Sequence, residues 1–239
     1  MILLLFDLDG TLVDTSADDA RLYGAALAEV AGRTVPLSGW DKYTEVTASA
    51  IAREALAPVL GRRVRDGEVY QAHQAQKRLW EQALAAGQLS LKPVAGALEL
   101  FAEAQARKGF VAAIATGGWG PSALIKLHAA GFPLEDLVLA SSDDAETRQS
   151  ILGTAEILAA AARGCFGFSA RVVIGDGVWD ARGARAVRGG FIGISSDPVH
   201  AMRLRAEGAA AVLPDFTDRA AFWAAVDKAV KRGSAAEGN

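Results

Sequence analysis

The feature of this sequence that most constrains its fold is an alternation between short apolar runs and longer segments with helical character. Continuous apolar character without alternation is typical of strands that are buried on both faces of a sheet. Strands that alternate with helices predict a parallel sheet with helices on both of its faces. The runs that we expect to form strands are Ile2–Phe6, Val111–Ala115, Arg171–Gly175 and Phe191–Ile194, with weaker candidates at Leu137–Ala140 and Ala211–Leu213.

The segments between these runs predict helices, and some of them carry residues that are typical of helix ends. Pro121 stands where the first turn of a helix tolerates proline. Ser150 and Asp218 could cap N-termini, because their side-chain oxygens can accept backbone N–H groups. The expected helices are Val94–Arg107, Ser122–Ala130, Ser150–Ala162, Val178–Val187, Val199–Ala206 and Asp218–Lys231.

Residues 15–91 differ from the rest of the chain, because they contain no convincing strand and are rich in Ala, Leu, Glu, Arg and Gln. The helical patterns in this stretch are Asp18–Ala31, Val46–Leu60 and Gly67–Gln88. An all-helical block after the first strand of an α/β pattern indicates an inserted domain. We therefore expect a core of residues 1–14 and 92–232 that carries a helical insertion of residues 15–91. The small and polar tail, residues 233–239, is expected to be frayed and flexible.

Charge and cysteine content narrow the class of protein. The 25 basic and 28 acidic side chains give a net charge of −3, which argues against a general nucleic-acid binder. The one cysteine, Cys165, cannot form an internal disulfide. The apolar run Ile2–Phe6 is too short for a signal peptide, and no stretch reaches the roughly 18 uninterrupted apolar residues of a membrane helix. We therefore expect a soluble cytoplasmic protein, a monomer or homodimer, that binds neither nucleic acid nor membrane.

Two acidic residues follow the first expected strand directly. Residues 6–11 read FDLDGT, so Asp7 and Asp9 stand where this strand ends. In an open parallel sheet, ligands bind beyond the carboxyl ends of the strands, so both carboxylates are expected at the functional edge. Their mutual repulsion would raise one pKa unless a cation lies between them. An ordinary Asp-Gly turn with a cap at Thr11 is the alternative interpretation.

A second acidic pair follows another expected strand. Residues 175–180 read GDGVWD, which places Asp176 at the strand end and Asp180 one helical turn later. Carboxylate oxygens are the ligands that a hard cation such as Mg²⁺ prefers. A turn with a helix cap would again be the plainer explanation for either pair alone. Two such pairs after apolar strands together predict a magnesium site.

A third candidate site follows the expected strand Val111–Ala115. Residues 115–121 read ATGGWGP, and the hydroxyl of Thr116, the glycines and a helix N-terminus together suit an anion such as phosphate. A dinucleotide site is a rival interpretation, because residues 118–123 match the pattern G-x-G-x-x-A. That match leaves the acidic pairs unexplained, and the ribose-binding acid would have to be Glu135 or Asp136.

These acidic and hydroxyl-bearing turns, in this order, resemble the motifs of the haloacid dehalogenase-like hydrolase superfamily. Residues 6–15, FDLDGTLVDT, resemble its first motif nearly verbatim. Thr116 stands where the second motif carries Ser or Thr, and residues 175–180 resemble the acidic fourth motif. The resemblance implies an α/β fold with a Rossmann-like parallel sheet core. It also implies a helical cap, which residues 15–91 resemble in position and composition.

The resemblance implies a phosphatase mechanism that depends on Mg²⁺. Asp7 would attack phosphorus and form an aspartyl-phosphate, while Asp9 would protonate the leaving oxygen and later activate water. The metal ligands would be the carboxylates of Asp7 and Asp176 and the backbone carbonyl of Asp9. Asp180 would lie close to them or support them.

The phosphoryl oxygens would be held by Thr116, the amide of Gly117 and a cation from the third motif. That motif usually supplies a lysine, and the best-placed cation here is Arg148, in the segment SSDDAETR. Arginine keeps the charge and adds bidentate geometry, but it does not imitate a compact ammonium group. Lys126, from another expected helix, is the alternative, and Arg148 would then be a solvated residue at a helix start.

Other members of the superfamily define the alternative functions. Haloacid dehalogenases do without a second acid in the first motif, so Asp9 argues against that activity. A sugar phosphomutase would keep every core residue and return the phosphoryl group to its substrate. A phosphonatase would need a lysine in the cap, for which Lys42 and Lys77 are available. A non-catalytic phosphate-binding scaffold would lack the nucleophile, and Asp7 is present.

We expect the substrate to be a small phosphorylated metabolite, such as a sugar phosphate or a phosphorylated short acid. A helical lid of residues 15–91 could close over a small molecule but would obstruct a folded phosphoprotein. The candidates for contact with such a substrate are Trp40, Lys42, Tyr43, Thr47, Arg53, Trp119 and Trp179.

Overall fold

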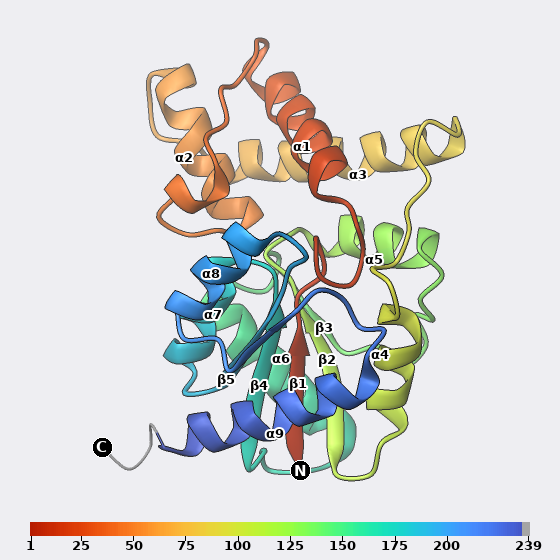
Figure 1. Cartoon of the computed structure of the whole chain (residues 1–239). Coiled ribbons are helices and arrows are strands. Elements are labelled where there is room, and N and C mark those ends of the chain that lie inside the picture. The colour runs from red at the N-terminus through yellow and green to blue at the C-terminus, as the bar shows by residue number, and fades with distance from the viewer. Residues whose placement is uncertain (236–239) are drawn as a thin grey trace.

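The computed structural model describes residues 1–235 and confirms the expected α/β fold, with a parallel sheet at its centre. The sheet has six strands in the order β3-β2-β1-β4-β5-β6, and every neighbouring pair is parallel. The strands are β1 (Ile2–Phe6), β2 (Phe110–Ala115), β3 (Leu139–Ala140), β4 (Ala170–Gly175), β5 (Gly190–Ile194) and β6 (Ala211–Leu213). The first strand therefore lies in the middle of the sheet, between β2 and β4 (Figure 1).

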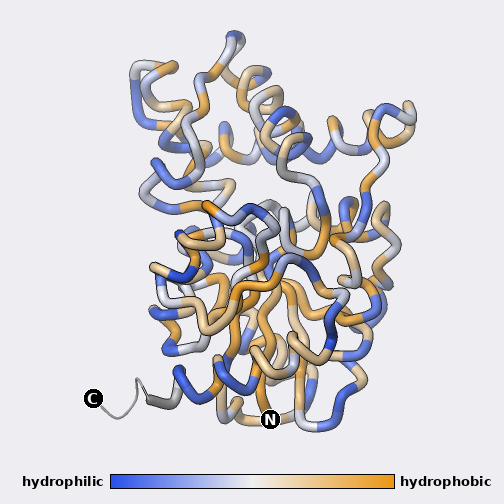
Figure 2. The backbone as a smooth tube through the Cα atoms, viewed as in Figure 1, coloured by the Kyte–Doolittle hydropathy of each residue, from blue (hydrophilic) through white to orange (hydrophobic). Residues whose placement is uncertain are grey.

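Helices cover both faces of the sheet, because successive side chains of each strand point to opposite faces and both are apolar. Leu4 and Phe6 belong to one apolar layer, and Leu3 and Leu5 belong to the other. The first layer is completed by α4 (Ala97–Ala106), α5 (Gly120–Ala129) and α9 (Arg219–Ala235). The second is completed by α6 (Arg148–Arg163), α7 (Val178–Ala186) and α8 (Pro198–Ala206). In Figure 2 the strands at the centre are coloured mainly as hydrophobic residues, whereas the helices around them carry both hydrophobic and hydrophilic residues.

A separate helical layer lies beyond the carboxyl ends of the strands (Figure 1). It consists of α1 (Ser16–Ala31), the short 3₁₀ helix η1 (Trp40–Lys42), α2 (Ala48–Leu60) and α3 (Asp66–Ala85). The layer has its own apolar cluster, which includes the buried side chains of Tyr23, Leu27 and Leu56. Trp119, from the turn after β2, is buried in the same cluster and so joins the helical layer to the sheet. None of the helices in the described part of the chain is long and apolar enough to cross a lipid bilayer.

The expected helices are present, but most of their ends differ from the sequence-based expectation by one to four residues. Helix α6 begins at Arg148, because the hydroxyl of Thr147 accepts the N–H of Ser150 at 3.1 Å and is therefore the cap that we had assigned to Ser150. Asp218 caps α9 as expected, since its carboxylate accepts the N–H of Ala221 at 2.8 Å.

The C-terminal end of α9 also differs from the expectation. This helix continues to Ala235, so residues 233–235 of the expected flexible tail are helical, and residues 236–239 lie outside the described part. The guanidinium of Arg232 donates to the carbonyl of Ala209 at 3.0 Å, which ties the last turns of the helix to the sheet domain.

Candidate active site

The register of the sheet brings the ends of three neighbouring strands to one level. Phe6 at the end of β1 pairs with Ile114 of β2 and with Ile174 of β4. The residue after Phe6 donates its N–H to the carbonyl of Ile174 at 2.8 Å, so the pairing continues one residue beyond the strand. The polar side chains that follow these strand ends at the same edge are Asp7, Thr116 and Asp176.

A tight turn follows β1 and positions the second acid of the first motif. Gly10 has a φ of 76°, a left-handed conformation that glycine adopts without steric cost, and its N–H donates to the carbonyl of Val13 at 2.9 Å. The chain therefore folds back on itself just after Asp9. The buried hydroxyl of Thr11 has no hydrogen-bond partner among the described residues, so Thr11 is not the cap of a simple Asp-Gly turn.

Arg148 joins two of the acidic residues. Its Nη2 lies 2.7 Å from Oδ1 of Asp7, and its Nε donates to Oδ1 of Asp180 at 2.9 Å. The second oxygen of Asp180 accepts the N–H of Gly177 at 3.0 Å, at the start of α7. Arg148 is only 5% exposed, Asp7 is 6% exposed and Asp180 is fully buried. The alternative of a solvated arginine at this position is therefore wrong.

Three carboxyl groups form a cluster that could hold a metal ion. Asp7, Asp176 and Asp180 each offer an oxygen, and the three oxygens lie within 4.8 Å of one another. Oδ1 of Asp176 is buried and has no hydrogen-bond partner among residues 1–235, so it is available to a cation. Nε2 of His200 lies 2.6 Å from the backbone carbonyl of Asp176 and holds this turn from α8. Oxygen ligands in such a set suit a hard divalent cation such as Mg²⁺.

Burial and crowding shift the ionisation of this cluster. Burial raises the pKa of Asp7 to about 7 against the opposing effect of Arg148, and the carboxylate of Asp180 adds to the rise. Burial and the neighbouring carboxylate of Asp7 also raise the pKa of Asp176 well above its usual range. A divalent cation at these oxygens would remove the repulsion that favours the protonated forms.

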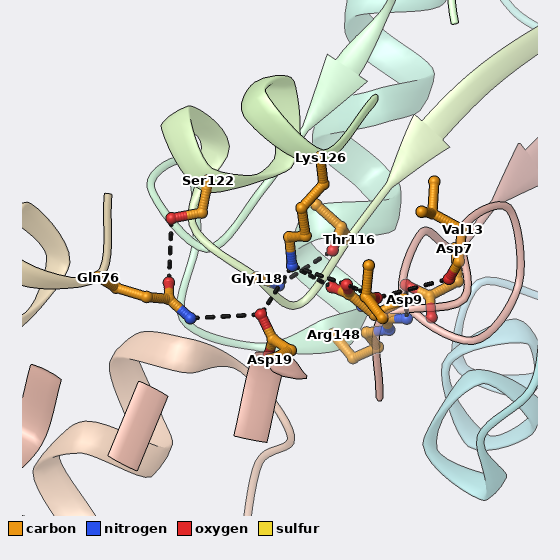
Figure 3. Close-up of polar contacts among 11 residues, drawn as sticks. Asp7, Asp9, Val13, Asp19, Gln76, Thr116, Gly118, Ser122, Lys126 and Arg148 are labelled. Carbon is orange, nitrogen blue, oxygen red and sulfur yellow. Dashed lines mark hydrogen bonds and ion pairs between the residues drawn. The ribbon is translucent and has the colours of Figure 1, made fainter. Parts of the chain in front are cut away.

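Lys126 of α5 binds the second acid of the first motif. Its Nζ donates to both carboxylate oxygens of Asp9, at 2.7 and 2.8 Å, and to Oδ1 of Asp19 at 2.8 Å (Figure 3). Burial favours the neutral amine, but the carboxylates of Asp19 and Asp9 raise the pKa of Lys126. The hydroxyl of Thr15 also donates to Asp9. The carboxylate of Asp9 is therefore directed toward α5 and is not among the clustered metal-site carboxylates.

The contacts of Lys126 continue into the helical layer. The amide of Gln76, on α3, donates to Oδ1 of Asp19 at 3.3 Å and accepts the hydroxyl of Ser122 at 3.1 Å (Figure 3). This polar chain links α1 and α3 of the helical layer to α5 of the sheet domain. Sequence reasoning missed Asp19, because an acid in the first turn of a helix is explained by the helix dipole alone.

The turn after β2 lies directly under the helical layer. The hydroxyl of Thr116 accepts the N–H of Gly118 at 3.0 Å. The carbonyl of Gly117 accepts the N–H of Ala48 at 2.7 Å. A Cβ atom at Gly117 would lie 2.6 Å from the carbonyl oxygen of Val46, so only glycine fits this close approach.

The dinucleotide interpretation of this turn does not agree with the structure. The N–H of Gly120, at the start of α5, donates to a carboxylate oxygen of Asp143 at 2.9 Å. The helix start that a pyrophosphate would need is therefore occupied by a negative charge. Neither Glu135 nor Asp136 lines the cavity described next.

One cavity, with a volume of about 230 Å³, connects these groups. The sheet domain contributes Asp7, Asp9, Thr116, Gly117, Gly118, Arg148, Asp176 and Trp179. The helical layer contributes Asp19, Tyr23, Trp40, Val46, Thr47, Ala48, Ile51 and Gln76. The structure therefore brings together every predicted site residue at this cavity except Asp180, which is buried behind the lining and bound to Arg148.

The residues considered for substrate contact divide into two groups. Those that line the cavity are Trp40, Thr47 and Trp179. Those that do not line it are Lys42, Tyr43, Arg53 and Trp119. Trp119 is 1% exposed and donates to the hydroxyl of Ser49 at 2.9 Å, so its role is to pack the sheet domain against the helical layer.

Comparison with known proteins identifies the family of this arrangement. A family model described as haloacid dehalogenase-like hydrolase matches residues 2–188. Among curated proteins, none matches the sequence.

Solved structures share the fold at low sequence identity. A hydrolase from Pseudomonas syringae is 21% identical, with a TM-score of 0.65 over 89% of this chain and 93% of the other. A HAD hydrolase of family IA, variant 3, from Entamoeba histolytica is 19% identical, with a TM-score of 0.65 over 91% of this chain and 95% of the other. CbbY from Rhodobacter sphaeroides, solved in complex with phosphate, is 18% identical, with a TM-score of 0.65 over 90% and 95%.

Proposed function

The chain belongs to the haloacid dehalogenase-like hydrolase family, and we propose that it is a Mg²⁺-dependent phosphatase that hydrolyses a small phosphorylated metabolite through an aspartyl-phosphate. The observation that carries this proposal is the position of the Asp7 carboxylate and its neighbours. This carboxylate is buried at the end of β1, 2.7 Å from the guanidinium of Arg148, in a cavity that Asp9 also lines. A nucleophile, a fixed cation and a second acid thus share one small space.

In the first half of the reaction, a carboxylate oxygen of Asp7 attacks phosphorus and the bond from phosphorus to the alcohol oxygen breaks. Asp9 donates a proton to that oxygen, so the alcohol leaves without negative charge. Arg148, the hydroxyl of Thr116 and the N–H of Gly117 bind the transferred phosphoryl oxygens, where negative charge is concentrated. The product of this half is an aspartyl-phosphate on Asp7.

In the second half, a water molecule attacks the phosphorus and the bond to the Asp7 oxygen breaks. Asp9, now a carboxylate, accepts a proton from that water. Inorganic phosphate leaves and both side chains return to their initial protonation states. One water molecule is consumed for each alcohol and each phosphate released.

The residues of the site fit Mg²⁺, because Oδ1 of Asp176 is buried without a partner in the described part of the chain and three carboxyl groups converge there. Asp7, Asp176 and the backbone carbonyl of Asp9 would hold the ion, with Asp180 beside them. When bound, Mg²⁺ offsets the repulsion between these carboxylates and a phosphate dianion.

We assign residues 15–91 to a cap over the core of residues 1–14 and 92–232. The two connections lie side by side, since the N–H of Asp14 donates to the carbonyl of Lys92 at 3.0 Å. A hinge at these two adjacent connections would let the cap open for a small molecule and close over it. Closure would exclude bulk water until the alcohol has left, and it would obstruct a folded phosphoprotein or nucleic acid.

Phosphate release by the purified protein tests this function. We expect release from small phosphomonoesters with Mg²⁺, and we expect Asp7→Asn to abolish it while the fold is retained, since an amide is a poor nucleophile. Asp227→Asn, an exposed site on α9, is the matched control and should be fully active. Activity of Asp7→Asn within tenfold of wild type, with deamidation excluded by mass spectrometry, would contradict the mechanism. Bisphosphate-dependent exchange without phosphate release would indicate the phosphomutase instead.

A further inference from the structure

The wall of the cavity that the helical layer forms is largely apolar and aromatic. Its apolar and aromatic members are Tyr23, Trp40, Val46, Ala48 and Ile51, and Trp179 of the sheet domain adds a second indole. Tyr23 and Trp40 meet edge to face, with ring centroids 6.0 Å apart. Because the phosphoryl group must lie at Asp7, at the sheet edge, the alcohol portion of the substrate lies against this wall.

The polar side chains on the same wall are already bonded to protein. The hydroxyls of Tyr23 and Thr47 donate to backbone carbonyls at 2.6 and 2.7 Å. The amide of Gln76 donates to Asp19 at 3.3 Å and accepts from Ser122 at 3.1 Å. An alcohol with several hydroxyl groups would lose its bonds to water on entering, and the donor hydrogens of the Tyr23 and Thr47 hydroxyls would already be used.

Positive charge at the cavity is limited to the groups that serve the phosphoryl transfer. Among the lining residues in the described part of the chain, Arg148 is the sole cation. Lys126 lies behind the lining, and all three of its hydrogen bonds go to carboxylates. These two cations face five carboxyl groups, those of Asp7, Asp9, Asp19, Asp176 and Asp180.

The two cations of the helical layer that were candidates for substrate contact, Arg53 and Lys42, do not line the cavity and supply no second anion site there. Arg53 pairs with Asp66 at 2.8 Å and with Glu146 at 3.2 Å. The side chain of Lys42 is 71% exposed, beside Asp41. A second phosphate or a carboxylate on the alcohol portion would therefore lose water without gaining a counter-ion, which is unfavourable for a buried charge.

We infer that the substrate is a phosphomonoester whose alcohol portion is apolar or aromatic and carries no second anionic group. This inference rests on the proposed phosphatase function and narrows it. It replaces the expectation of a sugar phosphate or a phosphorylated short acid. It also argues against a phosphomutase, because a bisphosphate would need a second phosphate site on the apolar wall. The reaction is hydrolysis of the ester bond by water to the free alcohol and inorganic phosphate.

A panel of phosphate esters that differ in the alcohol portion tests this inference. We compare kcat/KM for phosphate release from benzyl phosphate with kcat/KM for glycerol phosphate, glucose 6-phosphate, 2-phosphoglycolate and glucose 1,6-bisphosphate, with Mg²⁺. Benzyl phosphate should be favoured over each by about tenfold or more. A higher value for the sugar, acid or bisphosphate would overturn the inference while the phosphatase function stands. Release from none of them, or equal release by Asp7→Asn, would overturn the function and the inference with it.

Substitutions on the wall provide an independent test. Trp40 is half-buried and lines the cavity. Trp40→Arg places a cation on the wall, whereas Trp40→Leu keeps the wall apolar. Trp40→Arg should raise the ratio of kcat/KM for 2-phosphoglycolate to that for benzyl phosphate by about tenfold, and Trp40→Leu should leave benzyl phosphate preferred. Val46→Arg and Val46→Met repeat the comparison at a second lining position in case the first pair fails to fold.

The control for the added charge is Ile157→Arg, on α6, where the side chain is 70% exposed and outside the cavity. This variant should keep the wild-type ratio. An unchanged ratio in both lining arginine variants, with folding verified by thermal unfolding, would overturn the inference.

Discussion

Lys126 of α5 donates to both carboxylate oxygens of Asp9, at 2.7 and 2.8 Å, so the second acid of the first motif is held by a cation from a distant part of the chain. The same Nζ binds Asp19 of α1 at 2.8 Å. One buried ammonium group therefore orients the proposed acid–base residue and fastens the helical layer to the sheet domain.

Replacement of Lys126 should affect both stability and turnover. Lys126→Met leaves Asp9 and Asp19 in the site without their cation, so we expect a loss of about 3 kcal/mol in the free energy of unfolding. We also expect kcat to fall by about tenfold or more, because the carboxylate of Asp9 loses its orientation. Urea unfolding and steady-state kinetics measure the two effects.

Two further variants test whether these effects come from the carboxylates that lose their cation. Lys126→Met combined with Asp19→Asn should recover part of the stability, because one of the two unpaired charges is removed. Lys228→Met, at an exposed position of α9, should change neither quantity. Wild-type kcat in folded Lys126→Met would show that Asp9 does not depend on this ion pair.

Replacement of Asp9 should separate the two halves of the reaction. Asp9→Asn retains the nucleophile, so slow phosphorylation of Asp7 should remain possible without the acid, whereas the amide cannot take a proton from water. The aspartyl-phosphate should therefore accumulate while kcat falls by roughly 10²–10⁴. Mass spectrometry after acid quenching should detect a phosphoryl group on Asp7 in this variant and none in Asp7→Asn. Wild-type turnover by Asp9→Asn would exclude Asp9 as the acid–base residue.

Metal removal should abolish activity, and Mg²⁺ should restore it. Asp176→Asn should raise the Mg²⁺ concentration for half-maximal activity by about tenfold or more, since the negative charge of this carboxylate is lost and a neutral amide oxygen is a weaker ligand for Mg²⁺. Ca²⁺ should inhibit, because it takes more ligands at longer distances and would displace Asp7. Full activity in excess chelator, with no metal detected in the protein, would reopen the dehalogenase interpretation.

The stability of the metal-free protein should depend on pH through Asp7. Its pKa is raised from 3.8 to about 7, so between these values the folded protein holds a proton that the unfolded chain releases. Stability therefore falls as pH rises through this window. At pH 8 the free energy of unfolding of Asp7→Asn, measured with urea, should exceed that of wild type by up to about 4 kcal/mol, with a smaller difference at pH 5.

The control for this pH dependence is Asp227→Asn, whose side chain is exposed and far from the cavity lining. It should differ from wild type by the same small amount at both pH values. A wild-type protein that is more stable than Asp7→Asn at pH 8 would contradict the prediction.

Adjacent glycines in the turn after β2 offer a matched steric test. A Cβ atom at Gly117 would lie 2.6 Å from the carbonyl oxygen of Val46, whereas one at Gly118 would meet nothing closer than 3.4 Å. Gly117→Ala should therefore force the helical layer away from the site and lower kcat/KM by about tenfold or more. Gly118→Ala should stay within about threefold of wild type. Equal kinetics of the two variants would show that this close approach does not matter for function.

Much of the sheet domain could be predicted from the sequence. Strands such as Ile2–Phe6 are buried on both faces, so their apolar runs are continuous and can be recognised without knowledge of their neighbours. The acidic turns at Asp7 and Asp176 could also be located, because ligands of an open parallel sheet gather beyond its carboxyl ends. The helical layer formed by α1, α2 and α3 could be expected because residues 15–91 contain no convincing strand.

The helix ends were harder to predict, because they depend on single hydrogen bonds. Thr147 and Ser150 are both suitable caps by residue type, and the backbone conformation before α6 selects Thr147. The partners and the burial of a side chain are equally hard to predict, as Arg148 shows. Its charge was evident, but only the packing of α6 against α7 brings it to Asp180 and excludes water.

The sequence by itself determined the layered α/β fold and the edge of the sheet where the acidic residues gather, because these follow from local patterns of apolar and polar residues. The tertiary structure alone decided that Lys126 meets Asp9, 117 positions earlier, and that the wall of the cavity is apolar with its polar groups already bonded. The first contact joins α5 to the turn after β1, and the apolar wall forms where the helical layer docks on the strand ends. They depend on which faces of separate helices come together, and no local pattern in either segment specifies that arrangement.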